Sequence, residues 1–276
     1  MFAVTLSSCQ RSNMIRLIIS DIDGTLLGPD GRLPPENVVA LGLAAARGVR
    51  LAVATIRKRD SAEQIARRLG VACTLVCDGG ATIYDAQGAR LHSLSIPLDL
   101  ARALAALADA HQLPLLTTID DLNYYTPGSH PAAHIAAKGV DVDTALAALD
   151  RPPSRFIVRG ELGVELLMRA FADASLSFVR HYHADGTLAD AAITHAGATK
   201  EAALALLCQQ WALAPADVLA LGDAEADIGM LRLAGVGVAV GNAHASVKAA
   251  ADWVAPDAAD GGVAAAVRRF VLDDLH

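Results

Sequence analysis

A run of apolar residues near the start of the chain constrains the fold more than any other feature. Residues 15–20 read IRLIIS and lead directly into Asp-Ile-Asp-Gly-Thr at 21–25. A strand that is apolar on both faces is covered on both sides, which is typical of a parallel sheet flanked by helices. We therefore expect an α/β fold in which this strand lies inside the sheet and stops at a polar loop.

The segments that follow alternate between strand and helix. Apolar strands are expected at 49–54 and 73–77, and the same rhythm resumes late in the chain with strands at 218–221 and 236–240. A helical pattern separates each strand from the next. Alternating elements with short connections predict a doubly wound parallel sheet, a Rossmann-like core.

The middle of the chain differs in character. Residues 82–84 and 90–94 flank Asp-Ala-Gln-Gly at 85–88, a pattern that predicts an antiparallel hairpin. Short strands and alanine-rich helices of mixed order follow, which indicates an α+β unit. The expected organisation is an N-terminal extension at 1–13, a main domain formed by 14–81 and 188–276, and an inserted α+β domain at 82–187.

Composition limits the partners of the chain. The 276 residues carry 23 basic and 30 acidic side chains, a formal charge of -7, which argues against a partner held by nucleic-acid phosphates. The four cysteines lack both the paired spacing of a zinc site and the density of a disulfide scaffold. We find no basic leader and no apolar run long enough for a membrane span, so we expect a cytoplasmic protein that acts on small molecules.

Polar residues follow three of the expected parallel strands. Asp21, Thr55 and Asp223 each come directly after an apolar run, and Lys200 stands at the start of an expected helix. Ligands of open α/β sheets bind beyond the carboxyl ends of the strands, so these side chains are expected to converge. Each of these residues alone could be a turn residue or a helix cap. The hypothesis that all four have only such roles is weaker than the hypothesis that they form one site.

The predicted convergence suits phosphoryl transfer. A carboxylate can attack phosphorus when a cation neutralises the charge of the phosphate, and Asp21 and Asp223 offer the hard oxygen ligands that Mg²⁺ prefers. Lys200 and the Thr55 hydroxyl would stabilise charge in the transition state. Asp23 lies two residues beyond Asp21, where it can protonate the leaving oxygen and then activate water.

At the level of motifs the chain resembles the haloacid dehalogenase superfamily of phosphatases, in the Cof-type branch with a large inserted cap. The stretches that carry the resemblance are Asp21–Leu26, Val53–Thr55, Gly197–Glu201, Gly222–Asp227, Val238–Ala243 and Val247–Asp252. The resemblance covers nearly all of 14–271. Within the cap it rests on the order of the expected elements more than on sequence motifs.

The resemblance implies a role for each of six residues. It implies that Asp21 is the nucleophile and Asp23 the acid/base, and that Thr55 and Lys200 bind the transferring phosphoryl group. It further implies that Mg²⁺ is held by Asp21, the Asp23 carbonyl and Asp223, with Asp227 binding directly or through water. The implied substrate is a small phosphorylated metabolite, with a sugar phosphate as the default class.

Three positions depart from the pattern of the family. Ile56 stands where the family usually has glycine, Asp78 where it has asparagine, and Ala226 where it has asparagine. None of these changes removes a group that makes or breaks a bond in the expected mechanism.

The sequence leaves other hypotheses about the function open. A phosphomutase or phosphotransferase would share the chemistry of the core, and a non-catalytic protein could bind a phosphorylated metabolite. Dehalogenation is disfavoured because it has no use for Asp23, and a phosphonatase because Lys138, the lysine of the insert, fits a helix end. Candidates for substrate contacts in the cap are Tyr124, Tyr125, His130, His134, His181 and His183.

Overall fold

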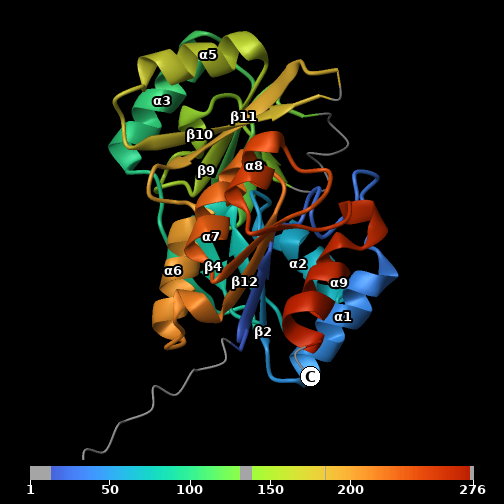
Figure 1. Ribbon diagram of the computed structural model, residues 1–276. Coiled ribbons are helices and arrows are strands. Elements are labelled where there is room, and N and C mark those ends of the chain that lie inside the picture. Colours follow the sequence, from blue (N-terminus) through green and yellow to red (C-terminus); the bar gives the residue numbers. More distant parts are fainter. Residues whose placement is uncertain (1–13, 131–138, 184, 274–276) are drawn as a thin grey trace, which may run out of the picture.

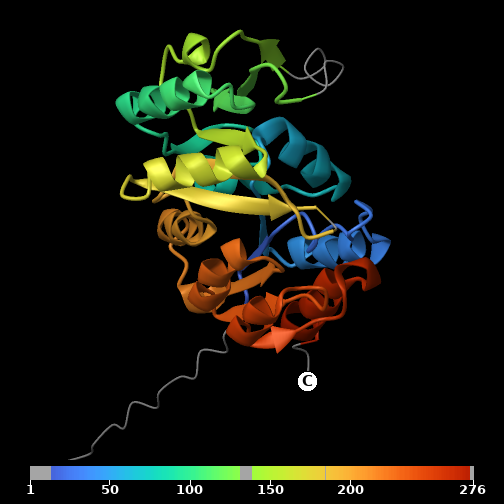
Figure 2. The same ribbon diagram turned by 90° about the horizontal axis from the view of Figure 1, so that it is seen from above.

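Two sheets organise the protein, which is described by a computed structural model over residues 14–130, 139–183 and 185–273. The larger sheet and its helices form one unit, called here the core. The smaller sheet forms a second unit, called here the cap, which packs against one end of the core (Figures 1 and 2). The predicted extension at 1–13, together with His134 and Lys138, lies outside the described residues.

The core sheet confirms the predicted doubly wound topology. Its eight strands are, in spatial order, β14 (Trp253–Val254), β13 (Val236–Ala239), β12 (Val218–Gly222), β1 (Leu17–Ser20), β2 (Arg50–Ala54), β3 (Thr74–Cys77), β4 (Thr82–Tyr84) and β5 (Arg90–Ser93). Strand β1 is central and pairs in parallel with both β12 and β2. All four of its residues are buried, as expected for a strand covered on both faces.

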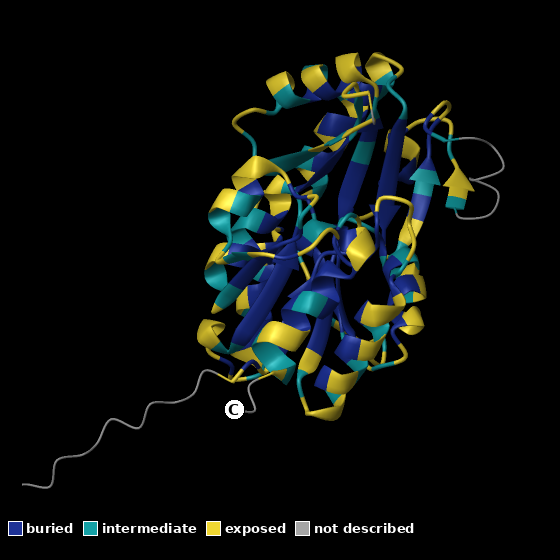
Figure 3. Cartoon of the chain, turned by 45° about the vertical axis from the view of Figure 1, so that its right-hand side comes forward, coloured by how far each residue is buried: buried dark blue, intermediate teal, exposed yellow. Residues whose placement is uncertain are grey.

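Helices cover both faces of this sheet (Figure 1). Ile18 of β1 packs toward the face covered by α1 (Pro35–Ala46), α2 (Arg59–Arg68) and α9 (Gly262–Val267). Its neighbours Leu17 and Ile19 pack toward the face covered by α6 (Lys200–Gln210), α7 (Ile228–Leu233) and α8 (Ala245–Ala250). Figure 3 shows the result, with buried strands between helices whose outer faces are exposed.

The cap is an α+β unit with helices on one face of its sheet. Its strands are, in spatial order, β10 (Leu176–Tyr182), β11 (Leu188–His195), β9 (Arg155–Arg159), β6 (Leu115–Ile119), β7 (Leu122–Tyr125) and β8 (Gly139–Asp141). Helices α3 (Leu98–Ala110) and α5 (Glu161–Ala170) bury residues such as Leu104 and Leu167 against Phe156 of β9. The other face of the sheet is turned toward the core, since Arg155 of β9 contacts core residues.

Strand pairing corrects the predicted membership of two elements. The hairpin β4–β5 was expected to open the insert, but β4 pairs antiparallel with β3 and extends the core sheet. Residues 188–195 were expected in the main domain, but as β11 they lie between β9 and β10 of the cap. Periodicity predicts that a strand forms but not which sheet edge it joins, because a hairpin suits either sheet. Between β8 and β9 the cap has a short 3₁₀ turn, Leu146–Ala148.

Within the described residues, no helix combines the length and the apolar character needed to cross a bilayer.

Candidate active site

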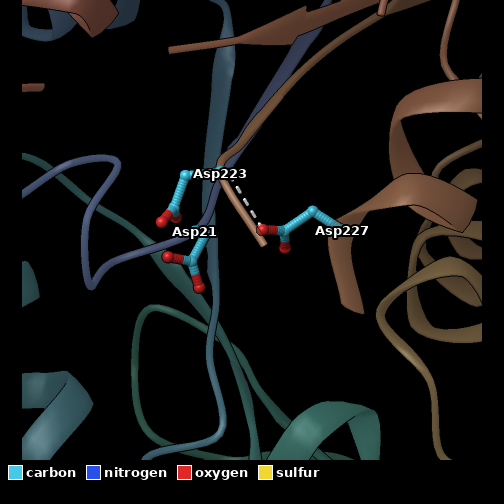
Figure 4. Close-up of side chains that lie close together, drawn as sticks. All are labelled: Asp21, Asp223 and Asp227. Carbon is cyan, nitrogen blue, oxygen red and sulfur yellow. Dashed lines mark hydrogen bonds between the residues drawn. The ribbon is translucent and has the colours of Figure 1, made fainter. Parts of the chain in front are cut away.

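The carboxyl end of the core sheet carries a cluster of three aspartates (Figure 4). Asp21 follows β1, and its backbone N–H donates to the Leu221 carbonyl of β12 at 3.0 Å. Asp223 follows β12, and Asp227 lies just before α7. One carboxylate oxygen from each of the three lies within 4.8 Å of the others. Residues that are about 200 positions apart in the chain therefore converge because β1 and β12 are neighbours in the sheet.

Lys200 lies against this cluster from the start of α6. Its Nζ donates to Asp21 Oδ1 at 2.5 Å and to Asp227 Oδ1 at 2.6 Å, and all three side chains are buried. The helix start is fixed by Thr199, whose hydroxyl accepts a hydrogen bond from the Ala202 N–H. The structure thus brings Asp21, Asp223, Asp227 and Lys200 together at one edge of the core sheet.

Asp227 is held by backbone as well as by Lys200. Its Oδ2 accepts the N–H groups of Asp223 and Ala224, each at 3.0 Å, and its side chain is completely buried. A carboxylate that accepts two backbone N–H groups and an ammonium has its hydrogen-bonding capacity largely used. Asp227 therefore fixes the loop that carries Asp223.

The turn after Asp21 brings Asp223 close to the backbone. Gly24 has φ +82°, and a Cβ on it would lie 2.4 Å from Asp223 Oδ2. Thr25 next to it donates its hydroxyl to Asp223 Oδ1 at 2.7 Å. Asn242 donates to the Gly24 carbonyl at 2.7 Å, which ties the same turn to the loop after β13. Glycine is required here both for the left-handed backbone and for the approach of the carboxylate.

Burial and mutual repulsion shift the pKa values of the cluster. Burial raises the pKa of Asp21 to about 8, with Asp227 and Asp223 adding to the rise and Lys200 opposing it. The pKa of Asp223 is also raised, chiefly by burial. Burial lowers the pKa of Lys200, but the carboxylates of Asp21 and Asp227 outweigh burial and the net direction is upward.

The donor set of the cluster fits a divalent metal ion. Three carboxylates face one ammonium, so full ionisation leaves two negative charges in a buried space. A hard cation with oxygen ligands would compensate that charge. Burial, with the charges of Asp227 and Asp223, raises the pKa of Asp21, and an added cation would favour its ionised carboxylate.

Asp23 lies outside this cluster. Its carboxylate is half-exposed and receives two hydrogen bonds from the Arg57 guanidinium, from Nε at 2.7 Å and from Nη2 at 2.5 Å. Arg57 also donates to the Ser61 hydroxyl at 3.0 Å. Two nearby carboxylates therefore have different environments, one buried beside Lys200 and one paired with an arginine near the surface.

Thr55, the remaining predicted residue, directly follows β2 at the same edge of the sheet. Its side chain is buried, and its Oγ1 accepts the N–H of Arg57 at 3.1 Å. The hydroxyl hydrogen is consequently directed elsewhere and is available to another acceptor. The loop 55–57 thus presents a hydroxyl donor beside the arginine that binds Asp23.

The three departures from the family pattern have different surroundings. Asp78 is buried and contacts Arg155 and Ser154 of the cap, with Ser154 Oγ donating to Asp78 Oδ2 at 2.9 Å. Ile56 is half-buried and lies against Gly79. Ala226 is exposed. Sequence reasoning missed Arg155, since an arginine at the start of a predicted strand carries no local signal of a partner 77 positions away.

The cap candidates differ in their surroundings. Tyr124 packs toward the helices while Tyr125 packs on the opposite face, as strand alternation predicts. Tyr125 is buried beside His130, with ring centroids 4.9 Å apart. His181 Nδ1 lies 2.6 Å from Asp190 Oδ1 on the neighbouring strand, and His183 is exposed.

A polar cavity of about 470 Å³ lies at the boundary between core and cap. It is formed by the start of α2 and by the turn between β6 and β7. Its lining residues are Lys58, Asp60, Ser61, Gln64, Asp120, Asp121 and Leu122. Arg57 connects this cavity to Asp23, because its guanidinium hydrogen-bonds both the Asp23 carboxylate and the Ser61 hydroxyl.

Comparison with known proteins gives a consistent picture. A family model described as haloacid dehalogenase-like hydrolase matches residues 18–267. The chain is 27% identical to 5-amino-6-(5-phospho-D-ribitylamino)uracil phosphatase YcsE of Bacillus subtilis, over 96% of this chain and 100% of that protein. It is also 27% identical to the chloroplastic endoribonuclease YBEY of Arabidopsis thaliana, over 92% of this chain but only 46% of that longer protein. A solved haloacid dehalogenase-like hydrolase from B. subtilis superposes with a TM-score of 0.81 at 21% identity, covering 93% of this chain and all of that one.

Proposed function

This chain belongs to the haloacid dehalogenase-like hydrolases, and we propose that it is a Mg²⁺-dependent phosphatase that cleaves a small phosphorylated metabolite through a phosphorylated Asp21. The observation that carries the proposal is the buried cluster of Asp21, Asp223 and Asp227 against Lys200. A set of carboxylates with unbalanced negative charge, at the ligand-binding edge of an α/β sheet, suits a metal ion and a phosphate together.

The metal would be held by oxygen atoms from two strand ends. We assign Asp21, Asp223 and the Asp23 backbone carbonyl as its ligands. Asp227 already accepts hydrogen bonds on both oxygens, so we assign it to the ion through water. When bound, Mg²⁺ supplies positive charge that reduces the repulsion between the Asp21 carboxylate and the phosphate.

In the first half-reaction an Asp21 oxygen attacks phosphorus and the bond to the leaving oxygen breaks. Lys200 places its ammonium beside the attacking carboxylate, where it stabilises negative charge on the phosphoryl oxygens. The Thr55 hydroxyl donates to another of those oxygens. Lys200 also orients Asp21, since its Nζ lies 2.5 Å from one oxygen and leaves the other to attack.

Asp23 acts as the general acid in the first half-reaction and as the general base in the second. Its carboxyl group protonates the leaving oxygen in the first step, and its carboxylate then takes a proton from the water that cleaves the aspartyl phosphate. Arg57 holds this carboxylate through two hydrogen bonds and thereby fixes its orientation. Because it lies outside the buried cluster, the Asp23 carboxylate is half-exposed and can be reached by the leaving oxygen and by water.

The substrate is proposed to be a small metabolite with a polar leaving group. The cavity beside Arg57 is lined by side chains with hydroxyl, amide, carboxylate and ammonium groups, and among the described residues Leu122 is its one apolar side chain. Such a lining suits a hydroxyl-rich moiety such as a sugar or sugar alcohol. The relative YcsE is named for a ribityl phosphate, which has a leaving group of that kind.

Hydrolysis of p-nitrophenyl phosphate tests the proposal directly. The purified protein is expected to turn over this substrate with Mg²⁺ and to lose turnover with excess EDTA. Asp21→Asn should lower kcat by about 10⁴-fold or more, because the nucleophile is gone. The matched control is Asp30→Asn, which alters an exposed aspartate and should leave kcat unchanged. Retained turnover in Asp21→Asn would refute the phosphoenzyme.

The role of Asp23 is tested by comparing leaving groups. Asp23→Asn should slow hydrolysis of a sugar phosphate far more than that of p-nitrophenyl phosphate, whose leaving group departs without a proton. Equal losses on both substrates would contradict the assignment of Asp23 as the acid.

A further inference from the structure

Three consecutive carbonyls of loop 55–57 are bound by donors from other parts of the protein. The Thr55 carbonyl accepts the Gly79 N–H at 3.0 Å, and the Arg57 carbonyl accepts the Asp78 N–H at 3.0 Å. The Ile56 carbonyl between them accepts a hydrogen bond from Nη1 of Arg155. Two of the donors belong to the turn after β3 in the core, and the third comes from the cap.

Arg155 is itself held in place inside the boundary between the two units. Its side chain is 6% exposed, and its Nε donates to Thr118 Oγ1 at 3.1 Å while lying 3.2 Å from Asp78 Oδ1. Within the described residues that Asp78 oxygen has no hydrogen bond, so the charge of Arg155 is what compensates it. A planar guanidinium can face a carboxylate and bind a carbonyl at the same time.

Arg155 determines the orientation of one peptide group in the loop. The carbonyl of the Ile56–Arg57 peptide binds Arg155, and its N–H donates to Thr55 Oγ1 at 3.1 Å. Because C=O and N–H point in opposite directions across a planar trans peptide, fixing one fixes the other. The Thr55 hydroxyl is thereby left to donate its hydrogen toward the site, and Arg57 is left in position to bind Asp23.

We propose that Arg155, whose charge Asp78 compensates, is a positioning residue by which the cap completes the phosphoryl-binding loop of the core. The inference rests on the proposed function and assigns to Arg155 a role that it performs through the peptide group of loop 55–57. It also explains the departure at position 78. A carboxylate compensates the buried guanidinium, whereas the carboxamide usual at this position would carry no charge.

The proposal separates stability from turnover in two variants. Asp78→Asn leaves Arg155 buried without its counter-charge but keeps the bond to the Ile56 carbonyl. Asp78→Asn combined with Arg155→Met removes both charges and also removes that bond. The double variant should therefore unfold at a higher urea concentration than Asp78→Asn, because no buried charge is left unpaired.

Turnover of p-nitrophenyl phosphate should change in the opposite order. At saturating Mg²⁺, kcat of Asp78→Asn should stay within about threefold of wild type, whereas the double variant should lose about tenfold to hundredfold, the scale expected for a misplaced binding group. If Arg155 and Asp78 only stabilised the fold, kcat of the two variants would fall in the same order as their stability. A double variant with kcat equal to or above that of Asp78→Asn would overturn the proposal.

Two further measurements keep the outcome interpretable. Arg67→Met removes an arginine from an exposed ion pair with Glu63 on α2 and should change neither quantity. If the methionine variant does not fold, Asp78→Asn with Arg155→Leu is measured in its place. Affinity for inorganic phosphate with Mg²⁺, by calorimetry, should weaken about tenfold in the double variant and not in Asp78→Asn.

Calorimetry also separates the two proposals. A wild-type protein that binds phosphate but hydrolyses nothing would refute the proposed function and leave the role of Arg155 to be judged by the phosphate affinities. Equal phosphate affinities for wild type and the double variant would refute the role of Arg155, whatever the turnover.

Discussion

The two sides of the candidate site are built in different ways. The carboxylate side, formed by Asp21, Asp223, Asp227 and Lys200, comes entirely from the core and is held by direct charge contacts. The loop side, residues 55–57, is held by backbone hydrogen bonds from the turn after β3 and by one arginine of the cap. The first side depends on charge balance, and the second depends on where the cap sits.

This difference predicts different responses to substitution. Removing a charge from the carboxylate side leaves other buried charges unpaired, so both stability and metal binding change by large factors. Removing a contact from the loop side displaces a peptide without unbalancing the cluster, so turnover changes by a smaller factor. Substitutions on the two sides that change stability and turnover by similar factors would contradict this comparison.

The largest effect is expected from Lys200→Met on the carboxylate side. Without the ammonium, Asp21 and Asp227 lie buried side by side, and breaking a buried ion pair costs about 3–5 kcal/mol in the free energy of unfolding. Urea unfolding with EDTA measures the loss. Mg²⁺ should restore part of it, because the ion compensates the same carboxylates.

Lys248→Met is the matched control for that measurement. Lys248 lies in α8 and should cost less than about 1 kcal/mol, the range of ordinary surface substitutions. A Lys200→Met protein as stable as wild type in EDTA would mean that the buried contacts of Lys200 with Asp21 and Asp227 do not stabilise the fold.

A somewhat smaller effect is expected from Asp223→Asn. The asparagine still accepts from the Thr25 hydroxyl, so the turn is kept while one charged metal ligand is lost. We expect kcat at saturating Mg²⁺ to fall by about 10² to 10³, a few kcal/mol of lost charge stabilisation. The Mg²⁺ concentration for half-maximal rate should rise as well. A normal Mg²⁺ requirement would remove Asp223 from the metal site.

The two sides also differ in how far the sequence could predict them. Asp21, Asp223 and Lys200 stand at strand and helix ends within recognisable motifs. Parallel pairing of β1 with β12 suffices to bring Asp21 and Asp223 together. Arg155 lies at the start of a cap strand, and its contact with Asp78 depends on how the two sheets pack. Patterns in sequence predict elements, whereas packing between units depends on side chains that have no spacing rule.

The same limit applied to the fold. The doubly wound core follows from the alternation of strand and helix, and the structure confirms it. The hairpin β4–β5 was placed in the wrong sheet, because its alternation fits any antiparallel neighbour and β3 happened to offer a free edge. No strand was predicted at 188–195, which were only assigned to the main domain, so their pairing with β9 and β10 was not foreseen.

The pH dependence of metal binding tests the charge balance of the carboxylate side without any substitution. Burial and the neighbouring carboxylates raise the pKa of Asp21 to about 8 without metal, above its usual value of 3.8. In that state the folded protein retains a proton that the unfolded chain has lost, so Asp21 stabilises the fold below pH 3.8 and this contribution is lost as pH rises through about 8.

Metal binding must displace this proton. The apparent affinity for Mg²⁺ should therefore increase by up to about tenfold per pH unit between pH 6 and 8, and should level off above that. Calorimetry in two buffers of different ionisation enthalpy would count the released protons. An affinity that is flat across this range would show that Asp21 is already ionised beside Lys200.

The smallest effect is expected on the loop side, from Ile56→Gly. The Ile56 side chain lies against Gly79, since a Cβ added to Gly79 would lie 3.0 Å from Ile56 Cδ1. Glycine removes this contact and increases the backbone freedom that folding must restrict, at a cost of about 0.5–1 kcal/mol. We expect KM for p-nitrophenyl phosphate to rise about two- to threefold, with kcat nearly unchanged because Arg155 still binds the carbonyl of residue 56. Ile56→Ala loses the same contact but keeps a stiffer backbone, so it should have a KM nearer to wild type; if alanine and glycine raise KM equally, the packing on Gly79 orders the loop more than the hydrogen bonds to its carbonyls do.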